Sequence, residues 1–170
     1  MSTNNEIIHQ CNYEMIEKLP GDIVLFLSKD SCTDPDHVAL YETEFLNKIS
    51  ASGMPPHRLA LKVGDCIIII SNLRIRDGHC NGTRYIVLEI KPHVIQAVKL
   101  EGGPNAEILI PRIPMLSKET DFVAPFQRIQ FPVLVAYYLT LNRAQGQPLD
   151  PSGMYLPQSV FSWEFLCRYF

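Results

Sequence analysis

Hydrophobic residues in the first part of the chain recur with the period of an α-helix. Within and just beyond residues 4–18 they lie three or four positions apart, which predicts a helix with one buried face. These positions are Ile8, Cys11, Met15 and Leu19. Thr3 opens a T-x-x-E string, the form of a capping box, and Pro20 with the following glycine would end the helix.

A β pattern takes over between residues 57 and 114. Short apolar runs with alternating stretches predict five strands, with turns that contain glycine at 63–64, 76–78, 81–82 and 101–104. The five ranges are 58–62, 65–71, 84–91, 93–100 and 107–112. Gly64 and Gly82 stand where a positive φ or a tight approach of the backbone would be needed. Short strands with glycine turns are typical of a small barrel of the SH3-like or OB-like kind.

Shorter elements precede and follow this β-rich segment. Residues 22–28 predict a strand and residues 42–49 a short helix, and the acidic, turn-rich residues 29–41 between them predict a loop. Serine, glycine and proline interrupt the helical pattern after residue 49, so we place a domain boundary after residue 53. Beyond the β-rich segment, residues 115–124 are interpreted as a polar linker.

The segment 131–149 joins an apolar run to a group of polar side chains. Residues 133–141 carry no charge and are rich in β-branched and aromatic side chains, which predicts a strand buried on both faces inside an α/β sheet. Pro132 stands at the start of this strand, where its missing N–H does not interrupt the sheet. Polar residues follow directly at 142–147, at the end of the strand where open α/β sheets bind ligands. A plain structural turn is the alternative explanation.

The composition is that of a folded chain. Of the 170 residues, 46% are hydrophobic and 19% charged, which excludes a disordered chain and allows one or two small domains. No apolar run approaches the roughly 18 residues of a membrane span, and the amino terminus does not resemble a signal peptide. We therefore expect an intracellular protein with no membrane partner. The five cysteines form no C-x-x-C pair, which favours reduced thiols over disulfides or a zinc site at Cys66, His79 and Cys80.

The net charge of −3 conceals an uneven distribution along the chain. Residues 1–56 carry three lysines against nine acidic residues, whereas residues 57–147 carry eleven basic residues against seven acidic ones. A basic segment of this kind can provide the surface that a phosphate backbone requires. Four basic residues stand near the ends of the predicted strands, where they would meet phosphates or remain solvated charges. They are Lys62, Arg74, Arg76 and Arg84.

Several short strings occur in one order along almost the whole chain. They are TN at 3–4, FLN at 45–47, PPHRL at 55–59, KVG at 62–64, CNGTR at 80–84, IPRIP at 110–114, QFP at 130–132 and TLNRAQGQP at 140–148. In this order and at about these spacings they resemble the second motor domain of Pif1-like DNA helicases, including the helicase segment of Helitron transposons. The last string is the most specific, since the family has a T-I-N-K-S-Q-G-Q-T-like sequence after an apolar strand.

This resemblance implies an α/β fold, namely a partial RecA-like domain interrupted by a small SH3-like β-barrel insertion, the 2B domain. Residues 1–53 would begin the RecA-like domain, residues 54–114 would form the insertion and residues 115–170 would return to the RecA-like domain. The family pattern is lost at Trp163. The implied function is that of a carboxy-terminal fragment of an ATP-dependent helicase that moves 5′ to 3′ on single-stranded DNA. The implied location is the nucleus or, second, the mitochondrion.

The resemblance also implies which residues meet ligands. Those placed against single-stranded DNA are Thr140, Asn142, Arg143 and Gln147, with His57, Arg58, Asn81 and Thr83 of the insertion. Gln145 and Gly146 would lie near the nucleotide cleft, where the intact family enzyme binds ATP and Mg²⁺. For the four residues of the insertion, a structural role in turns or at strand ends is the alternative, and Asn81 with Gly82 is a hairpin-turn signal in its own right.

Two further observations bear on the chemistry. Pro148 offers neither the N–H nor the hydroxyl that the family usually has at this position. Aromatic side chains for base stacking would be Tyr85, Phe126 or Phe131, for which we favour a role in the core.

The sequence contains no P-loop string and no Asp-Glu pair after a buried strand. In the resembling family these belong to the first RecA-like domain, which would then be a partner of this chain. The chain alone is expected neither to hydrolyse ATP nor to bind it tightly. An alternative function is a non-enzymatic module that binds single-stranded nucleic acid or another protein, or an inactive transposon-derived remnant.

Overall fold

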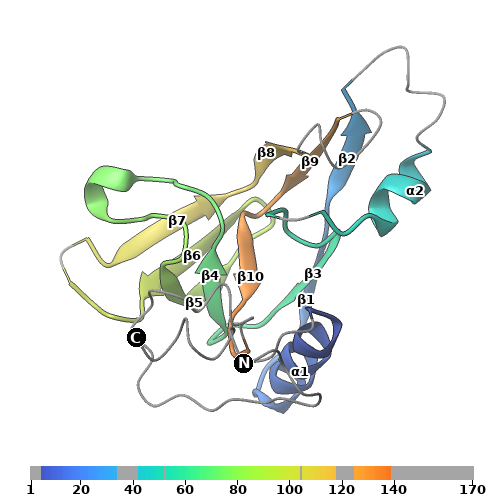
Figure 1. Ribbon diagram of the computed structural model, residues 1–170. Helices are drawn as coiled ribbons and strands as arrows, with labels where there is room; N and C mark the ends of the chain where they lie inside the picture. The colour runs from blue at the N-terminus through green and yellow to red at the C-terminus, as the bar shows by residue number, and fades with distance from the viewer. Residues whose placement is uncertain (1–4, 34–41, 52, 104, 118–124, 139–170) are drawn as a thin grey trace, which may run out of the picture.

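A computed structural model describes residues 5–33, 42–51, 53–103, 105–117 and 125–138 (Figure 1). The chain begins with a helix, continues through two strands and a second helix, and then forms a run of strands. The first elements are α1 (Asn5–Lys18), β1 (Val24–Leu27), β2 (Lys29–Cys32) and α2 (Thr43–Lys48). The later ones are β3 (Arg58–Leu61), β4 (Cys66–Ile69), the 3-10 turn η2 (Ile75–Asp77), β5 (Arg84–Ile90), β6 (Val94–Lys99), β7 (Glu107–Pro111), β8 (Ile113–Leu116), β9 (Phe126–Gln130) and β10 (Val133–Val135).

All strand pairs among the described residues are antiparallel, and they form three sheets. The largest sheet has the order β10-β4-β5-β6-β7. β1 pairs with β3, and β2 pairs with β9, which pairs in turn with β8. Strands from both ends of the described chain therefore flank the strands between them (Figure 1). A register shift between Val87 and Glu89 interrupts the pairing of β5 with β6, as a β-bulge does where a small sheet bends.

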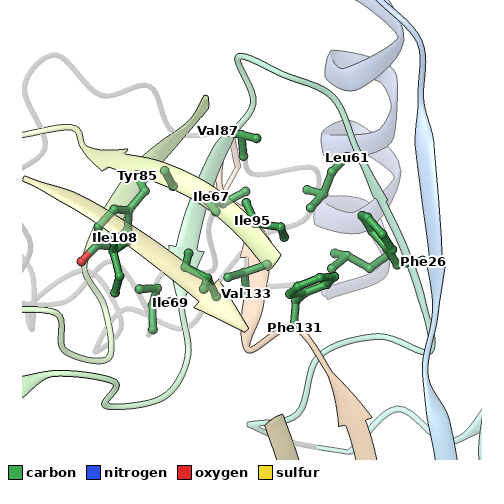
Figure 2. Close-up of a cluster of buried hydrophobic side chains, with 13 residues drawn as sticks. Phe26, Leu61, Ile67, Ile69, Tyr85, Val87, Ile95, Ile108, Phe131 and Val133 are labelled. Carbon is green, nitrogen blue, oxygen red and sulfur yellow. The ribbon is translucent and has the colours of Figure 1, made fainter. Parts of the chain in front are cut away.

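One hydrophobic core joins the β-rich middle of the chain to strands from both sides of it (Figure 2). Ile67, Tyr85 and Ile95 are inaccessible to solvent within the large sheet. Phe26 of β1 packs edge-to-face on Phe131, which precedes β10, with ring centroids 4.9 Å apart. Because this core is shared, the β-rich middle of the chain does not have a hydrophobic core separate from that of β1 and β10.

Most elements that the hydrophobic pattern predicted are confirmed. The two helices, the strand at β1 and the five strands from β3 to β7 all form within one or two residues of the expected ranges. Gly64 and Gly82 have φ of +92° and +93°, in the left-handed region that their side-chain-free backbone permits. No helix among the described residues is long and apolar enough to cross a membrane.

Three segments belong to strands that were not expected. Residues 29–32 of the predicted loop form β2, and residues 115–116 of the predicted linker belong to β8. β9 was not predicted as a strand. β2, β8 and β9 pair with one another, so their stability comes from partners distant in sequence rather than from a local apolar pattern.

The apolar run after Pro132 forms a shorter strand than expected, in a different setting. β10 pairs antiparallel with β4 at the edge of the large sheet, rather than lying inside an α/β sheet. The Tyr138 N–H donates to the side chain of Asn12, and the Tyr138 carbonyl accepts from it, so this backbone bonds to a side chain of α1 instead of a neighbouring strand. Residues 139–141 of the predicted strand lie outside the described residues. The domain limits after residues 53 and 114 stay a prediction.

Candidate nucleic-acid interface

The polar string that carries most of the predicted DNA contacts lies outside the described residues. This applies to Thr140, Asn142, Arg143, Gln145, Gly146 and Gln147. The structure does describe the segment that leads into the string, from β10 to Tyr138. The position from which the string departs is therefore defined.

Tyr138 is held by the first helix through its backbone. The Asn12 amide donates to the Tyr138 carbonyl at 3.0 Å, and the Tyr138 N–H donates to the Asn12 side-chain oxygen at 2.8 Å. Asn12 belongs to α1 and is buried. A buried amide that saturates both backbone groups of one residue fixes that residue far better than a contact at the surface would. The helix thus sets the position at which the chain leaves β10.

Tyr137 is held by the turn between β3 and β4. Its hydroxyl donates to Asp65 at 3.0 Å and accepts from the backbone N–H of Cys66 at 3.2 Å. Asp65 is inaccessible to solvent and also accepts from the backbone N–H of Lys62 at 2.6 Å. Burial raises the pKa of Asp65, against the opposing effect of the hydrogen bonds from Lys62 and Tyr137. Burial also raises the pKa of Tyr137 to about 12, so its hydroxyl remains a donor at neutral pH.

Lys62 is not one of the free basic groups that the sequence suggested. It is buried, and its ammonium group donates to the Leu19 carbonyl just beyond the end of α1 at 2.7 Å. A cation at that place satisfies one of the carbonyls that a helix end leaves open. Lys62 therefore joins α1 to the same turn that holds Tyr137 and is not available to a phosphate.

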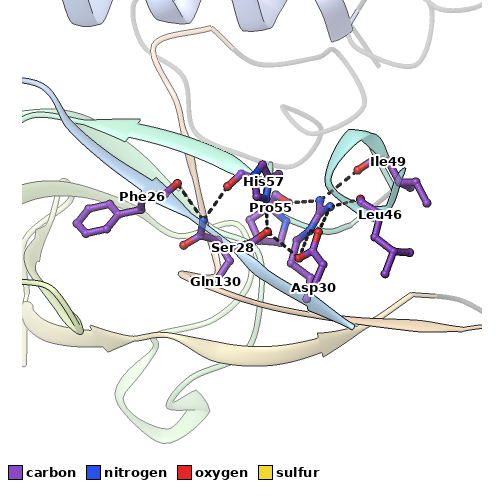
Figure 3. A network of polar contacts seen from close by, with 9 residues as sticks. Phe26, Ser28, Asp30, Leu46, Ile49, Pro55, His57 and Gln130 are labelled. Atoms are coloured by element: carbon purple, nitrogen blue, oxygen red, sulfur yellow. Dashed lines mark hydrogen bonds and ion pairs between the residues drawn. The ribbon is translucent and has the colours of Figure 1, made fainter. Parts of the chain in front are cut away.

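His57 and Arg58 lie together at the start of β3. Arg58 is exposed and His57 half-buried. The His57 imidazole lies beside Ser28, with Nδ1 2.8 Å from the hydroxyl oxygen, and that hydroxyl donates to Asp30 at 2.6 Å (Figure 3). The His57 carbonyl accepts from the Ser28 N–H and from the Gln130 amide. Both the backbone and the ring of this predicted site residue are therefore fixed.

Asp30, which accepts from Ser28, forms a buried ion pair with Arg128 that the sequence did not reveal. Arg128 of β9 is fully buried, and its guanidinium meets both carboxylate oxygens of Asp30 in β2, at distances from 2.7 to 3.0 Å. It also donates to the carbonyls of Leu46, Ile49 and Pro55 (Figure 3). The planar fork of arginine suits such a dense set of acceptors.

Little in the local sequence could have identified this pair. Arg128 stands in a pattern that alternates with buried Phe126 and Gln130, which places its side chain on the inner face of β9. The sequence F-Q-R-I-Q does not itself alternate between apolar and polar residues, so this inner face was not visible in it. Its partner Asp30 lies 98 positions earlier in a segment without any regular pattern, so the pairing itself could not be inferred.

Asn81 and Thr83 lie in the tight turn between the η2 segment and β5. The Asn81 N–H donates to the Asn72 side-chain oxygen at 2.9 Å, and Thr83 N–H donates to the Cys80 carbonyl at 3.1 Å. Gly82 and Thr83 continue the pairing with Ile69 of β4 through their backbones. Asn81 and Thr83 therefore both belong to a β-turn that leads into β5, and their contact with DNA stays a prediction. Within the described part of the chain, no hydrogen bond or ion pair links them to His57 or Arg58.

His79 is a buried histidine held by a tyrosine. Its Nδ1 lies 2.8 Å from the Tyr85 hydroxyl, and the ring is inaccessible to solvent. Burial is the main cause that lowers the pKa of His79, and Lys99 lowers it further. Burial raises the pKa of Tyr85 to about 12. No cluster of three or more potential metal ligands occurs in the described ranges.

An open cavity of about 520 Å³ lies next to this histidine. Its lining residues are Arg74, Asp77, His79, Val98, Asn105, Ala106 and Glu107. Arg74 and Arg76 are exposed here, on the segment that carries η2. The two carboxylates in the lining offset the positive charge, which makes this cavity a mixed polar surface rather than a dedicated phosphate site.

The three aromatic residues considered for base stacking all lie in the core. Tyr85, Phe126 and Phe131 have no exposed surface, which confirms the favoured interpretation. Their rings pack against other buried side chains and cannot stack on a base without unfolding of the core around them.

Comparisons with known proteins relate the chain to one group of enzymes. The family model of the DNA helicase Pif1 2B domain matches residues 44–90. The ATP-dependent DNA helicase PIF1 of Danio rerio is 26% identical over 155 residues, which cover 88% of this chain and 22% of that protein. The corresponding helicase of Rattus norvegicus is 25% identical over 153 residues, again 88% of this chain and 22% of the relative. The chain thus spans about a fifth of the length of these curated relatives.

Solved structures give the same result for the fold. The crystal structure of Pif1 helicase from Candida albicans superposes with a TM-score of 0.62 at 21% identity, over 86% of this chain and 37% of that one. A structure of two coordinating Pif1 helicases at forked dsDNA superposes with a TM-score of 0.59 at 18% identity, over 86% of this chain and 29% of that one. The two matches confirm the expected fold class, a partial RecA-like domain with a small β insertion.

Proposed function

Since this chain is Pif1-like and corresponds to a carboxy-terminal portion of these DNA helicases, we propose that it supplies the single-stranded DNA grip of such a helicase. The string at 140–147 would contact the strand, with His57 and Arg58 as further contacts. Gln145 and Gly146 would line one half of the cleft for ATP and Mg²⁺. The other half would come from a first RecA-like domain, and the direction of movement would be 5′ to 3′.

The observation that carries this proposal is that two different elements hold the segment before the string. Asn12 saturates the backbone of Tyr138, and Asp65 accepts from the Tyr137 hydroxyl. A strand end fixed by buried hydrogen bonds can present the following turn in one position, which is what a phosphate contact requires. The polar string begins two residues after Tyr138.

Charge and comparison add support. The basic residues of the chain are concentrated in 57–147, the segment that contains both proposed contact regions. Bacteroides Pif1, whose crystal structure is described as bound to ssDNA, superposes with a TM-score of 0.60 at 18% identity, over 86% of this chain and 31% of that one. Arginine at position 143 would provide a charged donor for a phosphate oxygen.

Fluorescence anisotropy with a labelled single strand and the matching duplex tests this function. We expect the folded chain to bind the single strand more tightly, with an affinity that falls steeply as salt rises. Arg143→Ala should weaken binding and reduce the slope of log K against log salt by about 0.7, the value for one phosphate contact on a single strand. Lys48→Ala, at an exposed lysine outside the basic segment 57–147, is the control and should leave the slope unchanged. Equal affinity for both DNA forms, or no binding at low salt, would contradict the proposal.

A further inference from the structure

The hydroxyl of Ser28 has only one hydrogen to share between two neighbours. Its oxygen lies 2.6 Å from Asp30 and 2.8 Å from Nδ1 of His57. Asp30 is paired with the Arg128 guanidinium, so it is a carboxylate that can only accept. The hydroxyl hydrogen therefore belongs to the bond with Asp30, and the Ser28 oxygen is left to accept from His57.

It follows that Nδ1 of His57 carries a hydrogen. In a neutral imidazole the other nitrogen, Nε2, is then a bare hydrogen-bond acceptor. Rotation of the ring would break the bond to Ser28, and the backbone cannot follow because the His57 carbonyl is held by Ser28 and Gln130 at 2.9 and 3.2 Å. Nε2 has no hydrogen-bond partner among the residues that the structure describes, and His57 is partly exposed.

We propose that Ser28, Asp30 and Arg128 are positioning residues that hold His57 as its Nδ1–H tautomer, so that Nε2 accepts a hydrogen bond from a base of the bound strand. This inference rests on the proposed function. Within a DNA strand the phosphate and deoxyribose oxygens only accept, and the hydrogen-bond donors are N–H groups of the bases. A neutral His57 of this tautomer thus contacts a base and not a phosphate.

The two kinds of contact differ in their response to salt. A phosphate contact releases counterions and adds about 0.7 to the slope of log K against log salt on a single strand. A base contact contributes affinity without changing that slope. Loss of the His57 contact should therefore lower affinity equally at every salt concentration, unlike the loss of Arg143.

The tautomer can be measured without any DNA. In a ¹⁵N-labelled chain at pH 8, where a free imidazole is neutral, the ring nitrogen shifts should show hydrogen on Nδ1 of His57. Ser28→Ala should shift the ring toward the Nε2–H tautomer, which is the commoner form of free histidine. Ser31→Ala, an exposed serine of β2, is the matched control and should change nothing. Hydrogen on Nε2 in the native chain would overturn the proposal.

Binding to two single strands tests the contact itself. One strand carries pyrimidine bases, and the other has the same length with abasic residues, which keep every phosphate but have no base N–H. Ser28→Ala and His57→Phe should each weaken binding of the first strand about five-fold, the factor of one hydrogen bond, with no change in salt slope. Neither should alter binding of the abasic strand.

Other outcomes have distinct meanings. Equal losses on both strands, or a smaller salt slope in Ser28→Ala, would show a phosphate contact and overturn the base contact. Unchanged binding in Ser28→Ala, with Arg143→Ala still impaired, would overturn the inference and leave the proposed function standing. Failure of the folded native chain to bind either strand would overturn both.

Discussion

At the scale of single residues, the buried Asp30–Arg128 pair joins three parts of the chain. Arg128 has no exposed surface, and its guanidinium bonds to β2, to α2 and to the connection before β3. Removal of one partner of such a pair leaves a charge buried without compensation. We expect Arg128→Met to lower the free energy of unfolding by about 3–5 kcal/mol, measured by urea denaturation.

Lys91→Met provides the control for that substitution. Lys91 pairs with Glu89 at 2.9 Å, yet both side chains are more than half exposed, so the change should cost no more than about 1 kcal/mol. A similar small loss in Arg128→Met would mean that the buried pair does not hold β2 and β9 together.

His79 makes the stability of the protein depend on pH. Its pKa is lowered in the folded state from an ordinary value of 6.5, chiefly by burial. Just below pH 6.5 the imidazole is therefore protonated in the unfolded chain but still neutral in the folded chain. The stabilisation by neutral His79 is complete above pH 6.5 and is lost as the pH falls from 6.5 through the folded-state pKa. Urea denaturation at pH 8 and pH 5.5 should show a drop that is smaller in His79→Gln.

His93→Gln is the control for this titration, because His93 is exposed between β5 and β6. That variant should keep the full drop in stability. A native chain and a His79→Gln chain that lose equal stability between the two pH values would contradict the account of His79.

Residue roles divide into those that a sequence can suggest and those that need the fold. The core roles of Tyr85 and Phe131 follow from apolar runs that a local pattern reveals. Lys62 was expected either to meet phosphates or to remain a solvated charge, but its ammonium group donates to a carbonyl 43 positions earlier. The tautomer of His57 depends on Ser28, which lies 29 positions away. Contacts of this kind arise from tertiary pairing and leave no local signal.

At the scale of elements, α1 and β10 act together although they lie at opposite ends of the described chain. Asn12 contributes the two hydrogen bonds that hold Tyr138. We expect Asn12→Ala to speed amide hydrogen exchange at Tyr138 by one to two orders of magnitude, which corresponds to about 1–3 kcal/mol for the lost bonds. The same change should weaken binding of single-stranded DNA.

Gln10→Ala is the matched change on the same helix. The Gln10 side chain is exposed and, among the described residues, donates to Glu14 at 3.4 Å and not to Tyr138, so exchange at Tyr138 should stay slow. Unaltered exchange at Tyr138 in Asn12→Ala would show that α1 does not fix the exit from β10.

Helices and strands were predicted correctly where the hydrophobic period of a segment is bounded by turn residues. Glycines lie in the connections β3–β4, β4–β5 and β6–β7, and Pro92 lies between β5 and β6, so the strand limits were readable. β2 was missed because Lys29 to Cys32 is polar and gains its strand form from pairing with β9. β10 was expected at the centre of an α/β sheet, yet it completes the edge of the large antiparallel sheet, because its apolar residues fit equally well beside Ile67 to Ile69.

At the scale of the whole molecule, the shared core and the uneven charge both bear on the proposed DNA contact. Strands that precede and follow the β-rich middle share its hydrophobic core. After β10, Tyr137 bonds to Asp65 and Tyr138 to Asn12, and the polar string follows in the sequence. The basic segment of the chain includes this string. In the proposed function, the DNA strand would meet residues that follow directly on this segment, which hydrogen bonds from Asn12 and to Asp65 hold in place.

Photo-cross-linking of the full chain to a 5-bromouracil-substituted single strand, followed by mass spectrometry of the tryptic peptides, tests this claim most directly. The account predicts adducts in peptides 129–143 and 144–168, with fragment ions that place them within 140–147, and fewer adducts when unlabelled single strand competes. Competition by duplex should be weaker. Adducts confined to α1 or β8, or adducts that no single strand displaces, would contradict the account.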